Sequence, residues 1–142
     1  TIAWSNPVPV AMTVIEHERQ LVLILRSNPP LADYWAPPAG YVETGESVPE
    51  AAIREAREEC GLDIMLNELT GVYSQADVDV LIVAYRAHSC GGRLVAGDDA
   101  SEVRLFGRGH LPAQAVPADG SATDRWLHEV ILDVTAPWHG TA

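Results

Sequence analysis

Two apolar runs near the start of the chain are separated by a short polar corner. Residues 8–16 and 20–26 are rich in valine, isoleucine and leucine, and His17 and Glu18 divide them. Runs of this length and composition, joined at a polar turn, are typical of two β-strands in a hairpin. Residues 27–40 then carry four prolines, which exclude a helix and a central strand, so we expect a loop there.

The clearest helix follows this loop. Ser47 is a favourable N-cap residue, Pro49 lies in the first turn, and Glu50 completes the spacing of a capping box. Residues 51–59 are mostly strong helix formers, and Gly61 is well placed to end the helix. These features predict one helix between Ser47 and Gly61.

Apolar runs return after this helix and predict three more strands. Residues 69–75, 78–88 and 103–107 have the composition of strands. Residues 89–102 predict a turn, a short strand and an acidic loop, and residues 108–120 predict another loop.

A second helix is expected over residues 121–137. Its apolar side chains form a wide stripe suited to packing on a sheet, made by Ala122, Trp126, Leu127, Val130, Ile131 and Val134. Strands, a helix, more strands and a closing helix indicate an α/β fold with a mixed sheet and helices packed on it. The length of 142 residues suits a single domain spanning 1–142.

The composition excludes several classes of protein. Apolar residues make up 47% of the chain, and no apolar run approaches the roughly 20 residues that cross a bilayer, so we expect no membrane partner. The N-terminal residues lack the basic region and apolar core of a signal peptide. Cys60 and Cys90 make neither a zinc set nor a disulfide framework, so a reduced, cytoplasmic protein is expected.

The net charge of −11 narrows the choice of ligand. All nine basic residues are arginines, and lysine is absent. Long nucleic acid needs a basic surface, so we do not expect this chain to bind it. A small anionic substrate remains compatible with the charge if metal ions screen it locally.

Three glutamates crowd one face of the first helix. At about 100° per residue, Glu55, Glu58 and Glu59 span roughly 100°, beside an apolar stripe made by residues 52, 53, 56 and 60. One explanation is a solvated acidic face, in which Arg54 offsets part of the repulsion. The other is a site for a hard divalent cation, which prefers such oxygen ligands, with a glycine-containing loop beside them.

Residues 40–62 resemble the Nudix box, the signature of the Nudix hydrolases. Its pattern is glycine, five residues, glutamate, seven residues and then R-E-U-x-E-E-x-G-U, in which U is a bulky apolar residue. The first U position holds Ala56, which is apolar but smaller than usual. The other positions match at the required spacing: Gly40, Glu46, Arg54, Glu55, Glu58, Glu59, Gly61 and Leu62. This specific match favours the metal explanation.

The resemblance extends more loosely over most of the chain and implies a fold and an activity. The implied fold is the Nudix α/β/α sandwich with a mixed β-sheet. The implied activity is Mg²⁺- or Mn²⁺-dependent hydrolysis of a nucleoside diphosphate linked to another moiety. Family members often form homodimers, for which an exposed apolar strand or the N-terminal segment would be the contact, and the sequence leaves the oligomeric state open.

The resemblance also implies metal ligands. Glu58 and Glu59 are expected to bind the metal, and Glu55 is expected to be a third ligand or a base for water. The carbonyl oxygen of Ala39, just before the box, is expected to join the metal shell. Metals held in this way would neutralise the diphosphate and lower the pKa of a bound water.

Other box residues are expected to position these groups. Arg54 would orient the glutamates by charge-assisted hydrogen bonds, and Glu46 would hold the loop against the helix. Gly40 is expected to contribute to substrate binding. Arg26 ends the second strand, where it is either a phosphate contact or an exposed strand end.

Many family members use a further carboxylate from a loop outside the box. Asp98, Asp99 and Glu102 are the candidates here, and Glu102 is preferred because the neighbouring strand could aim it inward; a solvated turn is the alternative. Tyr34 and Trp35 would either stack on a base or pack over the loop.

The substrate is less sharply indicated. The residues Pro-Ala-Gly at 38–40 resemble the branch of the family that cleaves ADP-ribose, so we favour ADP-ribose or a nucleoside diphosphate sugar. The proline that marks many ADP-ribose enzymes is replaced by Asp77. A nucleoside triphosphate pyrophosphohydrolase, like the MutT-like sanitising enzymes, is the alternative. A non-catalytic Nudix sensor domain is the alternative of another class, although such domains often lose box glutamates.

Overall fold

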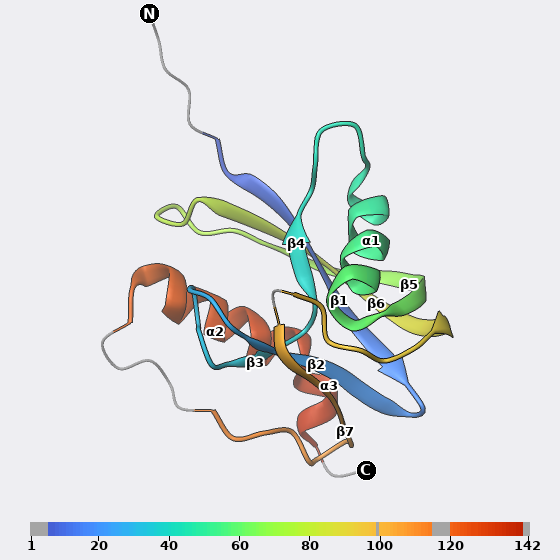
Figure 1. Cartoon of the computed structure of the whole chain (residues 1–142). Helices are drawn as coiled ribbons and strands as arrows, with labels where there is room; N and C mark the ends of the chain where they lie inside the picture. Colours follow the sequence, from blue (N-terminus) through green and yellow to red (C-terminus); the bar gives the residue numbers. More distant parts are fainter. Residues whose placement is uncertain (1–5, 99, 115–119, 141–142) are drawn as a thin grey trace, which may run out of the picture.

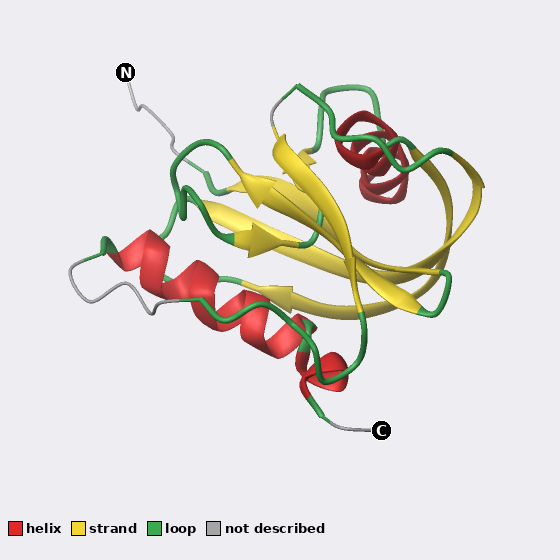
Figure 2. Cartoon of the chain, turned by 60° about the horizontal axis from the view of Figure 1, so that its bottom comes forward, coloured by secondary structure: helices red, strands yellow, loops and turns green. Residues whose placement is uncertain are grey.

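One mixed sheet organises the chain, and helices lie on both of its faces (Figure 1, Figure 2). The computed structural model describes residues 6–98, 100–114 and 120–140. Its elements are, in chain order, β1 (Val8–His17), β2 (Gln20–Arg26), β3 (Trp35–Ala36), β4 (Ala39–Tyr41), α1 (Val48–Cys60), β5 (Leu62–Tyr73), β6 (Val80–Gly92), β7 (Ala100–Phe106), α2 (Ala122–Val134) and α3 (Ala136–His139).

The sheet has seven strands among the described residues. Five of them follow the order β3-β2-β1-β6-β5, while β4 pairs with β1 and β7 pairs with β2. Strands β1 and β6 are parallel, and the other pairs are antiparallel. The structure therefore confirms the predicted α/β/α sandwich with a mixed sheet.

The alternation of side chains along β6 shows which helix covers which face. Ile82 and Ala84 belong to the same buried cluster as the α2 side chains, whereas Ala87 packs with Ala56 and Cys60 of α1. Successive strand residues point to opposite faces, so even positions of β6 face α2 and odd positions face α1. The predicted stripe of α2 is buried at Trp126, Leu127, Val130, Ile131 and Val134.

Helix α1 begins and ends where its sequence predicts. Ser47 accepts a hydrogen bond from the backbone of Glu50, whose side chain accepts one in return from the backbone of Ser47. At the other end Gly61 has φ 77°, a left-handed conformation that favours glycine. An added Cβ on Gly61 would also lie 2.1 Å from the carbonyl oxygen of Arg93, so no larger residue fits without displacing the backbone.

Several predicted boundaries were wrong. Strand β5 starts at Leu62, directly after α1, and not at residue 69. Three register shifts against β6 interrupt its alternation, which hid the first half of the strand from a periodicity argument. Strands β3 and β4 lie in the proline-rich segment predicted as a loop, because each fits beside the prolines without including one.

The short strand predicted within residues 89–102 does not form as a separate element among the described residues of that segment. Strand β6 continues to Gly92, and residues 93–97 have no regular structure. Their amides instead donate to the last carbonyls of α1: Arg93 to Gly61, Val95 to Cys60 and Gly97 to Glu59. This segment therefore caps the C-terminal end of the helix, which needs such donors.

The described residues include no helix both long enough and apolar enough to cross a membrane.

Candidate active site

The loop before α1 and the helix itself are held together by the box residues. The backbone amide of Ala39 donates a hydrogen bond of 2.8 Å to Oε2 of Glu59. Gly40 lies directly against the carboxyl group of Glu55, because a Cβ built on Gly40 would fall 2.1–2.4 Å from its three carboxyl atoms. Glu55 and Glu59 of the helix therefore both contact the loop, Glu59 at Ala39 and Glu55 at Gly40.

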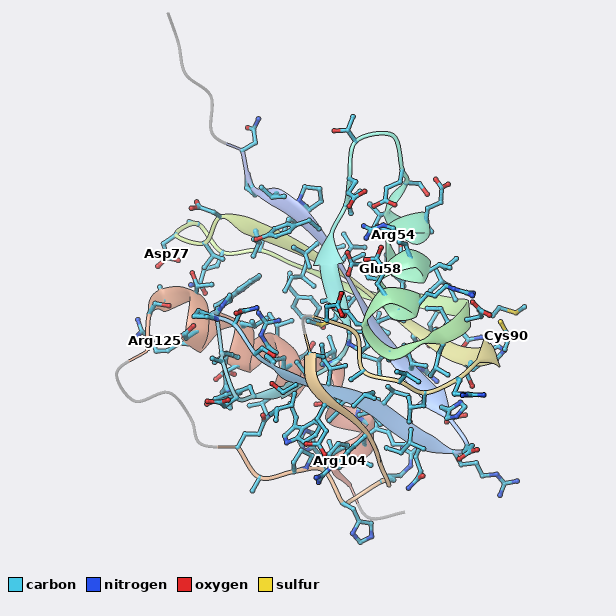
Figure 3. All side chains as sticks on the ribbon, in the orientation of Figure 1. Arg54, Glu58, Asp77, Cys90, Arg104 and Arg125 are labelled. Carbon is cyan, nitrogen blue, oxygen red and sulfur yellow. The ribbon has the colours of Figure 1, made fainter. Side chains whose placement is uncertain are left out.

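Arg54 connects this loop to the glutamates of the helix (Figure 3). Its Nε and Nη2 donate to the two carboxylate oxygens of Glu46 at 3.0 and 2.7 Å, and Nη2 also donates to the carbonyl of Tyr41 at 2.9 Å. Its Nη1 donates to Glu55 at 2.7 Å and to Glu58 at 3.0 Å. One guanidinium thus contacts the loop at Glu46 and Tyr41 and also two carboxylates of the helix, all by hydrogen bonds that a charge strengthens.

The charges around Arg54 shift the protonation equilibria. Hydrogen bonds from Arg54 lower the pKa of Glu46, whereas burial raises the pKa of Glu55 even though Arg54 also contacts it. The pKa of Arg54 itself is raised, chiefly by its hydrogen bonds with Glu46. Arg54 therefore does not fully offset the cost of burying the ionised Glu55 carboxylate. An additional cation beside Glu55 would stabilise its ionised form.

The same side of the helix borders a cavity of about 380 Å³. Glu55, Glu59 and Glu43 line it together with Arg26, Ala39, Gly40 and Tyr41. Carboxylate and carbonyl oxygens of this kind suit a hard divalent cation such as Mg²⁺ or Mn²⁺. The donor set therefore fits the expected metal, with Glu55 and Glu59 facing the cavity.

The third expected ligand lies outside this cavity. The side chain of Glu58 is 59% exposed and is held by Arg54. Within the described ranges, no three acidic, histidine or cysteine side chains come together closely enough to hold a metal. Glu58 nevertheless lies one turn from Glu55 on the helix, and Nη1 of Arg54 contacts both carboxylates, so both belong to the same acidic surface.

A second cavity, of about 290 Å³, adjoins the acidic one on the α2 side of the sheet. It is mostly apolar, with Met12, Ile82 and Trp126 among its walls and Asp77, Asp79 and Thr123 also lining it. Arg26 lines both cavities, and its Nε donates to the carbonyl of Pro30 at 2.7 Å. Burial lowers the pKa of Arg26.

Glu102, the preferred carboxylate outside the box, is not brought to the glutamates. It lies on β7 beside Leu25 and accepts a hydrogen bond of 2.6 Å from Arg104. Its neighbours Val103 and Leu105 pack against the α1 cluster, so Glu102 and Arg104 occupy the opposite face of the strand. Figure 3 shows Arg104 well away from Arg54 and Glu58. Asp98 is exposed, and Asp99 lies outside the described residues.

The aromatic candidates belong to the packing on the α2 side. Trp35 makes an edge contact with Phe106 at 5.1 Å between ring centroids and lies 5.4 Å from the guanidinium of Arg104, and it lines neither of the two adjoining cavities. Tyr34 makes an edge contact with His128 at 5.9 Å. The position of Trp35 therefore corresponds to the packing alternative, not to base stacking.

Sequence reasoning missed several residues that line the two cavities. Glu43 stands in the unspecified part of the box, and Asp77 and Asp79 lie in the turn between β5 and β6. Trp126 was assigned only to the core. These residues follow no sequence motif. Asp77, for example, lines the apolar cavity because the turn between β5 and β6 brings it close to α2 (Figure 3).

Comparison with known proteins places the chain in a family. A family model described as the NUDIX domain matches residues 6–127. The chain is 38% identical over 129 residues to an ADP-ribose pyrophosphatase of Methanocaldococcus jannaschii, which covers 87% of this chain and 76% of that protein. It is 33% identical over 87 residues to a dihydroneopterin triphosphate diphosphatase of Escherichia coli K12, covering 60% of this chain and 56% of the relative, less than two thirds of its length.

Solved structures agree with this placement. A NUDIX hydrolase from Nitrosomonas europaea superposes with a TM-score of 0.74 and 31% identity, over 79% of this chain and 64% of that one. An ADP-ribose pyrophosphatase from Streptococcus suis superposes with a TM-score of 0.66 over 92% of both chains, and at 18% identity it supports the fold alone. The chain therefore belongs to the Nudix hydrolases, pyrophosphohydrolases that act on nucleotide-linked diphosphates.

Proposed function

We propose that this protein hydrolyses the diphosphate bond of a nucleoside diphosphate linked to another moiety, with ADP-ribose or a nucleoside diphosphate sugar as the substrate. One observation carries the proposal: an acidic cavity and an apolar cavity adjoin, and Arg26 lines both. A diphosphate beside Arg26 would have its nucleoside in the apolar cavity and its cleaved bond beside Glu55 and Glu59.

The residues of the site would have separate roles in this reaction. Mg²⁺ or Mn²⁺ held by Glu55, Glu58 and Glu59 with the carbonyl of Ala39 would neutralise the diphosphate and acidify water. Burial makes Glu55 a stronger base than an exposed glutamate, which suits it to accept a proton from water. Arg54 acts as a positioning residue for Glu55 and Glu58, and Arg26 would bind a phosphate oxygen.

The choice of ADP-ribose rests on two observations outside the box glutamates. The Pro-Ala-Gly segment precedes the box, and the relative from M. jannaschii, an ADP-ribose pyrophosphatase, matches 87% of the chain. The similarity to a dihydroneopterin triphosphate diphosphatase supports the alternative, a nucleoside triphosphate pyrophosphohydrolase. All the box glutamates are present, which favours catalysis over a sensor domain.

A substrate panel separates these readings. ADP-ribose, nucleoside diphosphate sugars and nucleoside triphosphates are incubated with the enzyme and Mg²⁺ in ¹⁸O-labelled water, and the products are weighed by mass spectrometry. We expect cleavage of ADP-ribose to two monophosphates, one of which carries the label and so identifies the phosphorus attacked. Faster release of pyrophosphate from a triphosphate would support the alternative, and binding without turnover would support a sensor.

The metal ligands are tested by Glu58→Gln. This change removes one expected ligand charge but keeps the size of the side chain, so we expect activity to fall at least about tenfold with the fold retained. The matched control is Glu129→Gln, which alters an exposed glutamate of α2. Unchanged turnover in Glu58→Gln, measured at saturating Mg²⁺, would contradict the ligand assignment.

We also propose a cytoplasmic location. Both cysteines are free thiols, Cys60 buried and Cys90 exposed. This state suits a reducing compartment.

A further inference from the structure

The apolar cavity lies between the acidic cavity and a third one. It shares Arg26 and Ala39 with the acidic cavity, and it shares Asp77 and Trp126 with a cavity of about 290 Å³ that Gln75 also lines. Among the described residues, none lines both the acidic cavity and the third one. The apolar cavity therefore has a near end, beside the glutamates, and a far end at Asp77 and Trp126.

The order of the cavities decides which edge of a nucleoside base meets the far end. This step rests on the proposed function, in which the diphosphate lies beside Arg26 and Glu55 and the nucleoside enters the apolar cavity. The ribose is attached to the five-membered ring of a purine, so the six-membered ring is the part farthest from the phosphates. The outer edge of that ring would therefore point toward Asp77.

The walls between the two ends of this cavity are mostly apolar. Met12, Val78, Ile82 and Trp126 are buried and line it. Walls of this kind suit the flat faces of any base, because contact with them needs no hydrogen bond. Discrimination between bases therefore depends on the few polar groups at the far end, as is usual for a small-molecule site.

Asp77 places a hydrogen-bond acceptor at this end. The turn between β5 and β6 carries it toward the beginning of α2 (Figure 3). Nε2 of Gln75 donates to its Oδ1 at 2.8 Å, which fixes the carboxylate and leaves Oδ2 to accept from a ligand. Arg125, which lines the third cavity, donates to the carbonyl of Gly120. An ionised carboxylate only accepts hydrogen bonds, so Asp77 attracts an N–H group and repels a carbonyl oxygen.

Thr123 adds a hydroxyl group on the α2 side of the same cavity. It lies in the first turn of α2, three residues before Trp126, and residues at this spacing share one face of a helix. Both residues accordingly line the apolar cavity. A threonine hydroxyl can donate a hydrogen bond, so the cavity offers a donor at Thr123 in addition to the acceptor at Asp77.

We propose that Asp77 and Thr123 select adenine over other bases. Adenine carries an amino group, a donor, beside a ring nitrogen that accepts. Asp77 accepts from the amino group and the Thr123 hydroxyl donates to the ring nitrogen. Hypoxanthine differs from adenine only at this edge, where a carbonyl oxygen stands beside a ring N–H. Guanine also places a carbonyl oxygen at the position of the amino group, so Asp77 repels both bases.

Binding of AMP, IMP and GMP in the presence of Mg²⁺, measured by NMR titration, tests this selection. The wild type should bind AMP at least about tenfold more tightly than IMP or GMP, a moderate ratio because Asp77 is exposed to solvent. In Asp77→Asn the amide group can donate to a carbonyl oxygen, so the ratio should fall to about twofold or less. Thr123→Val keeps the shape of the side chain and should weaken AMP binding at least about threefold.

Asp63→Asn is the matched control, because it removes the same charge at the start of β5, where Asp63 pairs with Arg57. It should keep the full preference for AMP. Wild type that binds IMP or GMP as tightly as AMP overturns the inference, as does an Asp77→Asn variant that keeps the preference or an Asp63→Asn variant that loses it. The titration measures binding alone, so a preference for AMP without hydrolysis of ADP-ribose would overturn the proposed function and leave the base selection standing.

Discussion

Gly40, a position without a side chain, controls the placement of the partly buried Glu55 carboxylate. Gly40 allows the carboxyl group of Glu55 to approach within the volume that any Cβ would occupy. The requirement is steric, since a Cβ here would meet the end of a flexible side chain and no backbone atom is among its nearest neighbours. The box glycine therefore acts on Glu55, and through it on the acidic cavity.

Gly40→Ala should separate activity from stability. The added methyl group displaces the Glu55 carboxylate, so we expect turnover to fall at least about tenfold, while the melting temperature changes by no more than about 3 °C because the displaced group can rotate away. Gly140→Ala is the control, since a Cβ there meets nothing within 4 Å. Full activity in Gly40→Ala would show that Glu55 does not need its observed position.

Among the helices and strands, the sequence predicted the ones that are marked by local features such as caps, turns and apolar runs. The capping box and Gly61 set both ends of α1, and the hairpin of β1 and β2 follows from two apolar runs with a polar corner. The start of β5 was missed because its register shifts break the two-residue period on which a strand prediction depends. The sheet face to which Glu102 points was predicted wrongly, because it depends on the pairing of β7 with β2, two strands far apart in the chain.

Contacts between helices and strands also cannot be predicted from local sequence. Tyr73, at the end of β5, donates a hydrogen bond to Asp133 of α2. Burial and this carboxylate raise the pKa of Tyr73 to about 12. Nothing in the local sequence of either residue predicts the pairing, which ties the hairpin to the helix on the other side of the sheet from α1.

The shifted pKa of Tyr73 predicts how stability depends on pH. The phenol ionises near 10 in the unfolded chain and near 12 in the folded one, so its contribution is complete below pH 10 and is lost as the pH rises toward 12. Urea unfolding at pH 9, 10 and 11 should show a shallower decline for Tyr73→Phe than for the wild type. Burial also raises the pKa of Cys60 to about 11, so part of the decline remains in the variant. Parallel curves would contradict the Tyr73 contact.

For the whole molecule, charge has two separable effects. A net charge of −11 without any lysine weakens the folded state by self-repulsion, and any salt relieves this repulsion by screening. The buried Glu55 and its neighbours add a local demand for positive charge that Arg54 meets only in part. Screening acts on the whole surface, whereas a bound divalent cation acts at one site.

Thermal unfolding distinguishes these effects. At matched ionic strength, MgCl₂ should raise the melting temperature more than NaCl does, because binding to the folded state alone adds about 1.4 kcal/mol at a tenfold excess over the dissociation constant. For a chain of this length that is a further increase of roughly 3–6 °C. The excess should disappear in Glu58→Gln and persist in Glu129→Gln, whose net charges are identical. If MgCl₂ and NaCl gave the same curves for the wild type, the stabilisation would be screening alone and the acidic surface would hold no specific metal.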